Sequence, residues 1–341
     1  MPRSSRSQTG QLAVLGTETP VASIRGAASR NVWLTFTCTG CREKTRAPEG
    51  TQRAERRLCR ACFGKGGDRR PRELNELSGR EWARKSRSIE EYPDTRSDKQ
   101  RQHGASFPES LAREQIEIYT RVGETVLDPF VGVGTTIDAA IHLGRRGIGV
   151  DVSQEFLDLT HQDLRRRRAP RSLFQLHLAD ARSLDTVIPA ESVDFVLTSP
   201  PYGSLLRQVK GSFAYKWPEH TTLRRIPNPA PYSEHPLDIG NLEYDQFLEA
   251  IREVLTQTYK AQRSGSYAVW VVKDFRALKA DTPFVNYHGH FGELSEAVGF
   301  TLWDIRIWDQ TKFRPLVCLG YPSKNFYLNI GHSYLMVLRK R

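Results

Sequence analysis

Residues 198–203, TSPPYG, place a serine, two prolines and a tyrosine directly after the apolar run VDFVLT. Proline has no backbone N–H to donate to a β-ladder, so a strand must end here. The end of that strand then carries the hydroxyl of Ser199 and the aromatic ring of Tyr202 on a rigid Pro200-Pro201 turn. For the two prolines alone, a stiffened turn with no chemical role is the favoured interpretation. The neighbouring motifs decide between a stiffened turn and a turn that takes part in chemistry.

The segment LDPFVGVGTT, residues 127–136, has two glycines where a strand turns into a helix. We expect a strand to end in Asp128-Pro129-Phe130, and Gly132 and Gly134 to allow a tight turn into a helix beginning near Thr135. Glycines there let a ligand approach the backbone, and a helix N-terminus favours negative charge. A dinucleotide fingerprint needs a third glycine at Ile137, which disfavours a nicotinamide enzyme. A P-loop is excluded because no Gly-Lys-Ser/Thr follows.

Two further aspartates are expected at strand ends. Asp151 closes IGVD and can accept hydrogen bonds from both ribose hydroxyls of a nucleoside ligand. Asp180 closes FQLHLAD, where it could meet an exocyclic amine of adenine; a helix cap is an equally good interpretation of Asp180 alone. Together with Asp128, three carboxylates at the ends of successive strands around a glycine turn favour a nucleoside pocket.

Four of the five cysteines, Cys38, Cys41, Cys59 and Cys62, follow the spacing C-x2-C-x17-C-x2-C. This spacing predicts a structural, tetrahedral four-thiolate Zn²⁺ site, and disulfides are the weaker alternative without a secretion signal. The basic insert between the pairs would suit contact with DNA or RNA, and a protein-docking role is the other alternative. Cys318 stands alone and is expected to be a core or loop thiol.

The elements that must position these residues follow an alternating pattern. We expect a disordered basic tail at 1–30, a zinc ribbon at 31–66, a linker with an introducing helix at 67–104, and a catalytic domain at 105–341. Strands are expected at 125–130, 147–152, 174–180, 193–199, 266–275, 301–309 and 333–340. Helices are expected at 111–119, 135–143, 154–168, 244–262 and 294–298. Strands separated by helices predict an α/β fold with a doubly wound, mostly parallel sheet, and the last strand is expected to be antiparallel.

Charge is concentrated in the first part of the chain. Residues 1–100 hold 21 Lys and Arg against 12 Asp and Glu, whereas the whole chain carries a net charge of +11. A basic N-terminal segment suits phosphate contacts, and a solvated tail is an equal alternative. No apolar run approaches the ~20 residues that span a bilayer, and the N-terminus lacks a convincing signal peptide. A cytoplasmic protein without membrane contact is therefore expected.

Motif by motif, residues 103–340 resemble the amino-group DNA methyltransferases, which methylate cytosine N4 or adenine N6 with S-adenosylmethionine. HGASFPESLAREQI, containing Phe107 and Pro108, resembles the segment that contacts the methionine end of the cofactor. DPFVGVGTT resembles the cofactor loop, IGVDVS the ribose-binding strand end, and SPPY the catalytic tetrad. The cofactor motifs precede SPPY, which matches the non-permuted order of the family.

The resemblance implies the site and its mechanism. Ser199, Pro200, Pro201 and Tyr202 would be catalytic, and the residues implied to bind cofactor are Phe107, Pro108, Asp128, Phe130, Gly132, Gly134, Thr135, Asp151 and Asp180. The Ser199 side chain and the Pro200 carbonyl would accept hydrogen bonds from an exocyclic amine, and Tyr202 would stack on a base flipped out of double-stranded DNA. Methyl transfer would be direct and in line.

Serine at position 199 favours cytosine N4 as the target, because Ser-Pro-Pro in this family is associated mainly with N4-cytosine enzymes. Adenine N6 in DNA and guanine N2 in RNA are the alternative targets, and an inactive nucleic-acid adaptor is the non-enzymatic one. Residues 204–241 and 310–332, which mix basic and aromatic side chains, are the candidate target-recognition segments. A separately encoded restriction endonuclease, as in restriction-modification pairs, is a further candidate partner.

Overall fold

The structure is a computed structural model of the 341-residue chain, and it describes residues 32–39, 42–60, 74–92, 107–201, 235–276, 284–312, 324 and 326–341. The chain divides into two compact units, Met1–Pro71 and Arg72–Arg341. None of the helices in these described ranges is both long and apolar enough to cross a membrane.

The first unit is built on a small hairpin. Strands β1 (Trp33–Thr37) and β2 (Lys44–Pro48) pair antiparallel, and a single helical turn, α1 (Gln52–Glu55), follows. The buried apolar residues described here are Cys38, Ala47, Ala54 and Leu58. A core of this size is small for an independent unit, and units of fewer than about 40 residues usually need a metal, disulfides or a partner to fold.

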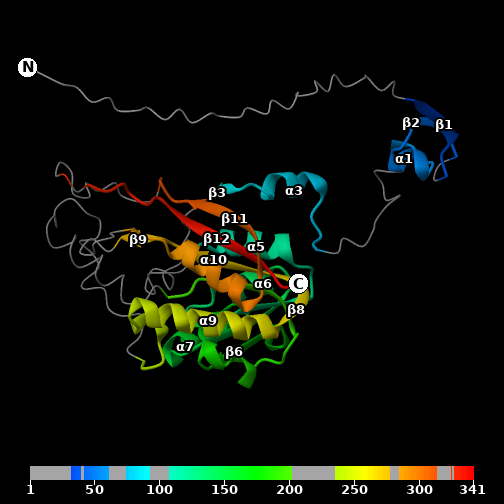
Figure 1. Cartoon of the computed structure of the whole chain (residues 1–341). Coiled ribbons are helices and arrows are strands. Elements are labelled where there is room, and N and C mark those ends of the chain that lie inside the picture. Colours follow the sequence, from blue (N-terminus) through cyan, green and yellow to red (C-terminus); the bar gives the residue numbers. More distant parts are fainter. Residues whose placement is uncertain are drawn as a thin grey trace, which may run out of the picture. The chain divides into compact units, whose positions relative to one another are not determined.

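The second unit contains an eight-stranded sheet in the order β3-β11-β12-β8-β7-β4-β5-β6 (Figure 1). Its strands are β3 (Ile89–Glu91), β4 (Thr125–Asp128), β5 (Arg146–Asp151), β6 (Phe174–Leu178), β7 (Val193–Thr198), β8 (Gln262–Val272), β11 (Thr301–Asp309) and β12 (His332–Arg339). Only β12 runs antiparallel to its neighbours, β8 and β11. The doubly wound, Rossmann-like sheet and the antiparallel last strand are therefore confirmed. The described residues also include the short pair β9 (Phe275–Arg276) and β10 (Phe284–Val285).

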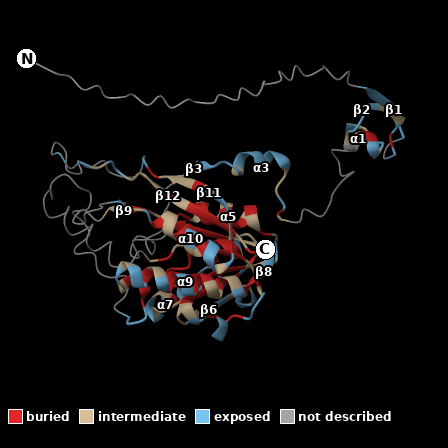
Figure 2. Ribbon diagram, in the orientation of Figure 1, coloured by how far each residue is buried: buried red, intermediate tan, exposed pale blue. Residues whose placement is uncertain are grey.

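Helices cover both faces of this sheet. They are α5 (Glu109–Tyr119), α6 (Thr135–His142), α7 (Gln154–Arg166), α9 (Tyr244–Ala261) and α10 (Tyr287–Val298), with the 3₁₀ turns η1 (Arg171–Leu173), η2 (Ala181–Thr186) and η4 (Ile239–Asn241). Alternate residues of a strand point to opposite faces. Val269 and Val271 of β8 accordingly pack with α5 and α6, whereas Ala268, Trp270 and Val272 pack with α9 and α10. Figure 2 shows the buried residues concentrated in the sheet and on the helix faces that meet it.

The predicted elements agree with these bounds within about two residues for most strands and helices. The exceptions are β8, which begins at Gln262 rather than 266, and α10, which begins at Tyr287 rather than 294. Gly289 and Gly292 lower the helix propensity of the first turns of α10. Packing offsets this cost, because Tyr287 and Phe291 are both fully buried against the sheet.

The segment between the two predicted domains contributes to the sheet. Residues 74–92 form α3 (Gly79–Lys85), which begins with a capping box between Ser78 and Glu81, and then β3. Strand β3 pairs in parallel with β11 and so extends the sheet beyond its last long strand. This part of the expected linker therefore lies within the second unit and is built into its sheet.

Candidate active site

Asp128 joins the glycine turn to the strand that precedes Ser-Pro-Pro. It is the last residue of β4, is only 3% exposed, and accepts hydrogen bonds from the Phe130 N–H (3.0 Å) and from the hydroxyls of Thr136 and Thr198 (2.6 Å each). Burial raises the pKa of this carboxyl to about 6, and the three hydrogen bonds oppose that shift. The end of β4, the start of α6 and the end of β7 are thus held by one side chain. Protein donors bind both of its oxygens, and direct contact of Asp128 with cofactor stays a prediction.

The glycine turn forms as predicted between β4 and α6. Gly132 and Gly134 both have positive φ, 49° and 82°, and Thr135 is the first residue of α6. A Cβ on Gly134 would lie 2.5 Å from Cγ2 of Thr160, whose hydroxyl donates to the Gly132 carbonyl at 3.0 Å. Thr160 of α7 therefore fixes the turn from behind and requires glycine at position 134. The half-buried ring of Phe130 lies edge-on to Trp270 of β8, with centroids 6.4 Å apart.

Asp151 lies at the end of β5, beside this turn. Its carboxylate accepts the backbone N–H of Gly132 (2.8 Å) and of Ser153 (2.9 Å). Burial raises its pKa, the negative charge of Asp238 adds to that shift, and the backbone hydrogen bonds oppose it. A carboxylate has about four acceptor positions, so the group keeps acceptor capacity for a ligand beside these backbone donors. The structure brings Asp151 to the glycine turn, as a ribose-binding residue requires.

The other expected cofactor residues lie in different surroundings. Asp180 caps η2 through the Arg182 N–H (2.8 Å) and forms a bidentate ion pair with the Arg182 guanidinium, whose closest approach is 2.6 Å. The structure thus contains the helix cap that was the alternative for Asp180. Phe107 is 5% exposed and packs in the core, and Pro108 is the N-cap of α5. The roles of these three residues in cofactor binding stay predictions.

Ser199, Pro200 and Pro201 follow β7 directly, and Tyr202 lies outside the described residues. Strand β7 is the immediate parallel neighbour of β4, so the tetrad and the glycine turn begin at adjacent positions of one sheet edge. The turn η4 packs against the tetrad, because a Cβ on Gly240 would lie 3.0 Å from Cβ of Pro201. Sequence reasoning gave no role to Thr136 and Thr198, which lie inside the LDPFVGVGTT and TSPPYG segments, or to the 238–240 turn within 204–241.

The candidate target-recognition segments lie mostly outside the described residues. Of 204–241, the structure describes 235–241, where the buried Asp238 caps η4 by accepting the Gly240 N–H at 2.8 Å. Of 310–332, it describes 310–312, 324 and 326–332, where the Gln310 N–H donates to the Gly331 carbonyl at 2.8 Å. DNA recognition by either segment stays a prediction.

Two of the four predicted zinc ligands are described, and they lie together. The Cys59 N–H donates to the sulfur of Cys38 at 3.2 Å, and Cys38 is 1% exposed. Cys41 and Cys62 lie outside the described residues. Within the ranges that are described, no group of three or more His, Cys, Asp and Glu residues is placed to hold a metal ion.

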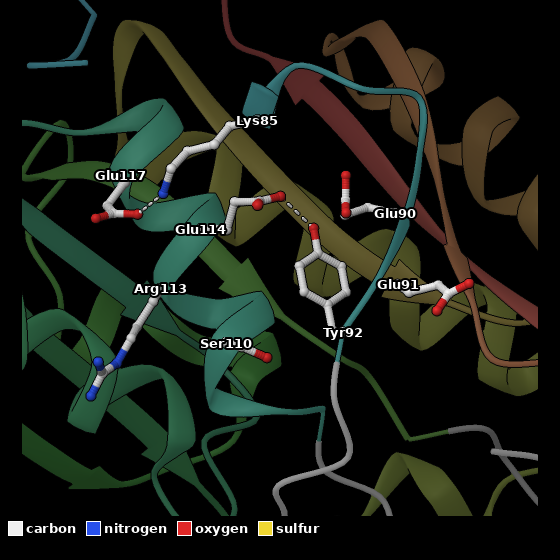
Figure 3. Close-up of a pocket in the computed structure, with 8 residues that line it drawn as sticks. All are labelled: Lys85, Glu90, Glu91, Tyr92, Ser110, Arg113, Glu114 and Glu117. Carbon is white, nitrogen blue, oxygen red and sulfur yellow. Dashed lines mark hydrogen bonds and ion pairs between the residues drawn. The ribbon is translucent and has the colours of Figure 1, made fainter. Parts of the chain in front are cut away.

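A pocket of about 330 Å³ lies away from these strand ends, between α5 and the 85–92 segment (Figure 3). Its lining residues are Lys85, Glu90, Glu91, Tyr92, Ser110, Arg113, Glu114 and Glu117. Lys85 pairs with Glu117, and the Tyr92 hydroxyl donates to Glu114 at 2.6 Å. Arg306 of β11 binds the same Glu114 at 3.0 Å. These charges attach the 85–92 segment to the sheet, and the pocket contains none of the residues expected to do chemistry.

Comparisons with known proteins agree with the motifs at this edge. A family model described as a DNA methylase, N6_N4_Mtase, matches residues 17–162, a range that contains the glycine turn and Asp151 and ends before Ser199. The chain is 42% identical over 60 residues to the Type II methyltransferase M.MjaI of Methanocaldococcus jannaschii, covering 18% of this chain and 20% of that protein. It is 38% identical over 91 residues to M.BglI of Bacillus subtilis, covering 26% of each. These matches support the amino-methyltransferase family.

The matches to this amino-methyltransferase family span about a fifth to a quarter of the length of these relatives. They support S-adenosylmethionine as the cofactor. They do not distinguish cytosine N4 from adenine N6 as the methylated atom. Among solved structures, TrmN from Thermus thermophilus is similar over 70% of this chain and 50% of that chain, at 18% identity and a TM-score of 0.41.

Proposed function

We propose that this protein is an S-adenosylmethionine-dependent DNA methyltransferase that methylates the exocyclic N4 amine of cytosine in double-stranded DNA after base flipping. The observation that carries the proposal is the Asp128 contact set. One buried carboxylate binds the hydroxyl of Thr136 at the start of α6 and that of Thr198, the residue before Ser199. The turn that would hold a cofactor and the turn that would hold an amine are therefore fixed relative to each other.

The residues at this edge fit the cofactor. Gly132 and Gly134 leave the turn without side chains at two positions, and the half-buried Asp151 carboxylate lies beside it with acceptor capacity for ribose hydroxyls. When bound, S-adenosylmethionine supplies an electrophilic methyl group on a positively charged sulfur. The expected contacts of Phe107, Pro108, Phe130, Thr135 and Asp180 belong to the same proposal.

The tetrad would activate and orient the amine. The lone pair of an exocyclic amine is delocalised into the base, so the nitrogen is a weak nucleophile. Hydrogen bonds from its N–H groups to the Ser199 side chain and the Pro200 carbonyl would localise that lone pair towards the methyl group, with Tyr202 stacked on the base. The rigid Pro200-Pro201 backbone fixes the position of the Pro200 carbonyl before the base binds. The packing of Gly240 on Pro201 restrains this turn further.

The decisive experiment is methyl transfer from radiolabelled S-adenosylmethionine to duplex DNA or bulk RNA, followed by digestion and identification of the methylated nucleoside. N4-methylcytosine in DNA is expected. If N6-methyladenine is found instead, the target is adenine and the proposed methylation of an exocyclic amine still holds. Label found only in RNA would refute the proposal that the substrate is DNA.

Variants of the tetrad test its role. Ser199→Ala should lower the transfer rate about 10²-fold and leave cofactor affinity unchanged, because it removes one acceptor of the amine. Tyr202→Ala should abolish transfer. The matched control is Ser192→Ala at the other end of β7, whose hydroxyl donates only to the Pro189 carbonyl at 2.6 Å and should not affect transfer. Full activity of Ser199→Ala would show that the Ser199 side chain is not a required acceptor for the amine.

We further infer that Cys38, Cys41, Cys59 and Cys62 hold a structural Zn²⁺ in the first unit. Cys38 and Cys59, from the two predicted pairs, lie within one N–H···S contact, and such a contact stabilises a thiolate. The turn after Cys38 is closed by the Arg42 N–H on the Cys38 carbonyl (2.8 Å), with Arg42 at φ 64°. Metal analysis should find one zinc per chain, lost in Cys59→Ser and retained in Cys318→Ser. A full complement of zinc in Cys59→Ser would exclude the four-cysteine site.

A further inference from the structure

A second cluster of titratable side chains lies on the opposite side of the tetrad from the cofactor residues. In the sheet order, β4 and β5 lie on one side of β7, and β8 and β12 lie on the other. Asp274 follows the carboxyl end of β8, His332 begins the antiparallel β12, and His288 lies in the first turn of α10. Since β7 and β8 are parallel and Thr198 pairs with Trp270, these residues share the sheet edge at which Ser199 ends β7.

Asp274 orients the His288 ring. The carboxylate is 1% exposed and accepts both the His288 backbone N–H (3.0 Å) and its Nδ1–H (2.7 Å). A carboxylate can only accept, so Nδ1 carries the proton in the neutral imidazole and Nε2 carries the lone pair. The His288 side chain is 27% exposed, so part of the ring is open to solvent. The pair therefore has the arrangement of a histidine base held by a buried carboxylate.

Tyr334 of β12 fixes the plane of the same ring. Its ring stacks on His288 with centroids 4.0 Å apart and an interplanar angle of 12°, and His332 contacts its edge at 4.9 Å. Burial and the nearby Asp274 raise the pKa of Tyr334 to about 12, so it stays neutral near pH 7. Asp274, Tyr334, Tyr244 and His290 are the described titratable groups on the elements next to His288. His332 joins this cluster through the Tyr334 ring, and the charges of Lys273, Asp274, His288 and Asp309 act on His332.

Packing connects this cluster to the tetrad. Gly240 lies against Pro201, and Tyr244 begins the helix that follows the Gly240 turn. The Tyr244 hydroxyl lies 2.8 Å from Nδ1 of His290, in the same helical turn as His288. The Tyr244 ring also meets Phe275, the residue after Asp274, edge-on at 6.1 Å. The Gly240 turn and helix α9 thus join Pro201 to the elements that hold the Asp274–His288 pair.

We propose that Nε2 of His288, oriented by Asp274, accepts the proton that the exocyclic amine releases during methyl transfer. This inference rests on the proposed function. The amine nitrogen attacks the methyl carbon, the carbon–sulfur bond breaks, and its electron pair goes to the sulfur. The nitrogen then holds a positive charge and one proton too many. That N–H bond breaks, its electron pair returns to nitrogen, and the proton bonds to the Nε2 lone pair, directly or through one water. No further reactant is required.

The tetrad itself contains no group suited to accept the proton that the amine releases. A serine hydroxyl and a prolyl carbonyl accept hydrogen bonds from the amine, but neither group retains a proton near neutral pH. Histidine is the side chain best suited to accept a proton between pH 5 and 8. The carboxylate of Asp274 would stabilise the imidazolium that forms, and the exposed part of His288 would return the proton to solvent.

The test is the pH dependence of single-turnover methyl transfer by the full chain on a saturating DNA duplex. The wild-type rate should rise with pH and reach a plateau as an imidazole loses its proton. His288→Asn should lower the plateau rate about 10²-fold and remove this rise, and added imidazole should restore part of the rate. Asp274→Asn should also lower the plateau rate and leave cofactor affinity unchanged, because Nδ1 of His288 loses the carboxylate that orients the ring. A residue with a purely structural role would not change the pH profile in these ways.

Matched controls keep the test independent of folding. His142→Asn changes an exposed histidine in the last turn of α6, outside this cluster, and should retain the wild-type profile. Thermal unfolding and cofactor affinity report the integrity of each variant. A wild-type profile in His288→Asn, a rise that disappears only in His332→Asn, or a His288→Asn defect confined to DNA affinity would each overturn the proposal. The last result would identify a phosphate contact. If the wild-type protein methylates no exocyclic amine, the proposed function itself fails, and that outcome is distinct from all three.

Discussion

The Asp128 contact set makes the stability contributed by Thr198 dependent on pH. Thr198 is fully buried, and its hydroxyl donates to Oδ1 of Asp128 at 2.6 Å. Thr198→Val keeps the side-chain volume and removes that donor, and the Phe130 N–H still donates to the same oxygen at 3.0 Å. The variant should therefore unfold more easily, and the size of the loss should follow the charge of Asp128.

The magnitude follows from the charge state of the acceptor. Burial raises the pKa of Asp128 to about 6, so the group is a carboxylate at pH 8 and protonated at pH 5. A hydrogen bond to a charged group contributes ~1.5–3 kcal/mol to stability and one between neutral groups ~0.5–1.5 kcal/mol. Thr198→Val should thus lower the free energy of unfolding by about 2 kcal/mol at pH 8 and about 1 kcal/mol at pH 5.

The sign follows from proton linkage. Loss of the hydroxyl destabilises the carboxylate, so the pKa of Asp128 in the folded variant rises further above its value in the unfolded chain. Between these two folded-state pKa values the folded variant holds more protons than the folded wild type. Its unfolding free energy therefore falls relative to wild type as pH increases through about 6.

The assay is urea unfolding of the full chain at pH 5 and pH 8, with Thr258→Val as the control. Thr258 is equally buried, but its hydroxyl donates to the Leu255 carbonyl within α9 at 2.9 Å, so its loss should be the same at both pH values. Equal losses for Thr198→Val at both pH values, or a larger loss at pH 5, would refute the assignment of a charged acceptor.

Three other substitutions test the supports of the site. Gly240→Ala places a Cβ 2.9 Å from Oδ1 of the buried Asp238 and 3.0 Å from Cβ of Pro201, so single-turnover transfer should fall by roughly 10-fold to 10²-fold; an unaltered rate would mean that this contact does not position the tetrad. Gly134→Ala combines φ 82° with a Cβ 2.5 Å from Thr160, and calorimetry should show a loss of about 2–4 kcal/mol; a stable, cofactor-binding variant would contradict the rigid turn. Arg306→Met removes the buried guanidinium that binds Glu114 and the carbonyls of Lys85 and Arg87, and should cost about 3–5 kcal/mol in denaturant titrations, whereas a loss below about 1 kcal/mol would show that the 74–92 segment is held by other contacts.

Most of the sheet could be predicted because its signals are local. Apolar runs bounded by glycine, proline or aspartate predicted β4 to β7 within two residues, and residues 301–309 were predicted with the bounds of β11. The first turns of α10 could not be predicted, because glycines and histidines give little helical signal. Packing of Tyr287 on Phe247 and of Phe291 on Trp270 stabilises this part of the helix, and neither partner is near in the sequence.

The candidate site likewise has features that the sequence predicts and features that depend on the sheet. The types and order of the motifs were enough to predict a glycine turn, the Asp151 strand end and the Ser-Pro-Pro turn, since each is a short segment whose backbone is constrained by its own residues. Their arrangement required the sheet: Asp128 and Thr198 are 70 residues apart and meet because β4 and β7 are parallel neighbours. The Asp274–His288 pair and its stacking on Tyr334 had no motif at all. Hydrogen bonds and ring contacts between distant residues form only when strand pairing brings them together, so the tertiary structure alone decided which side chains surround the tetrad.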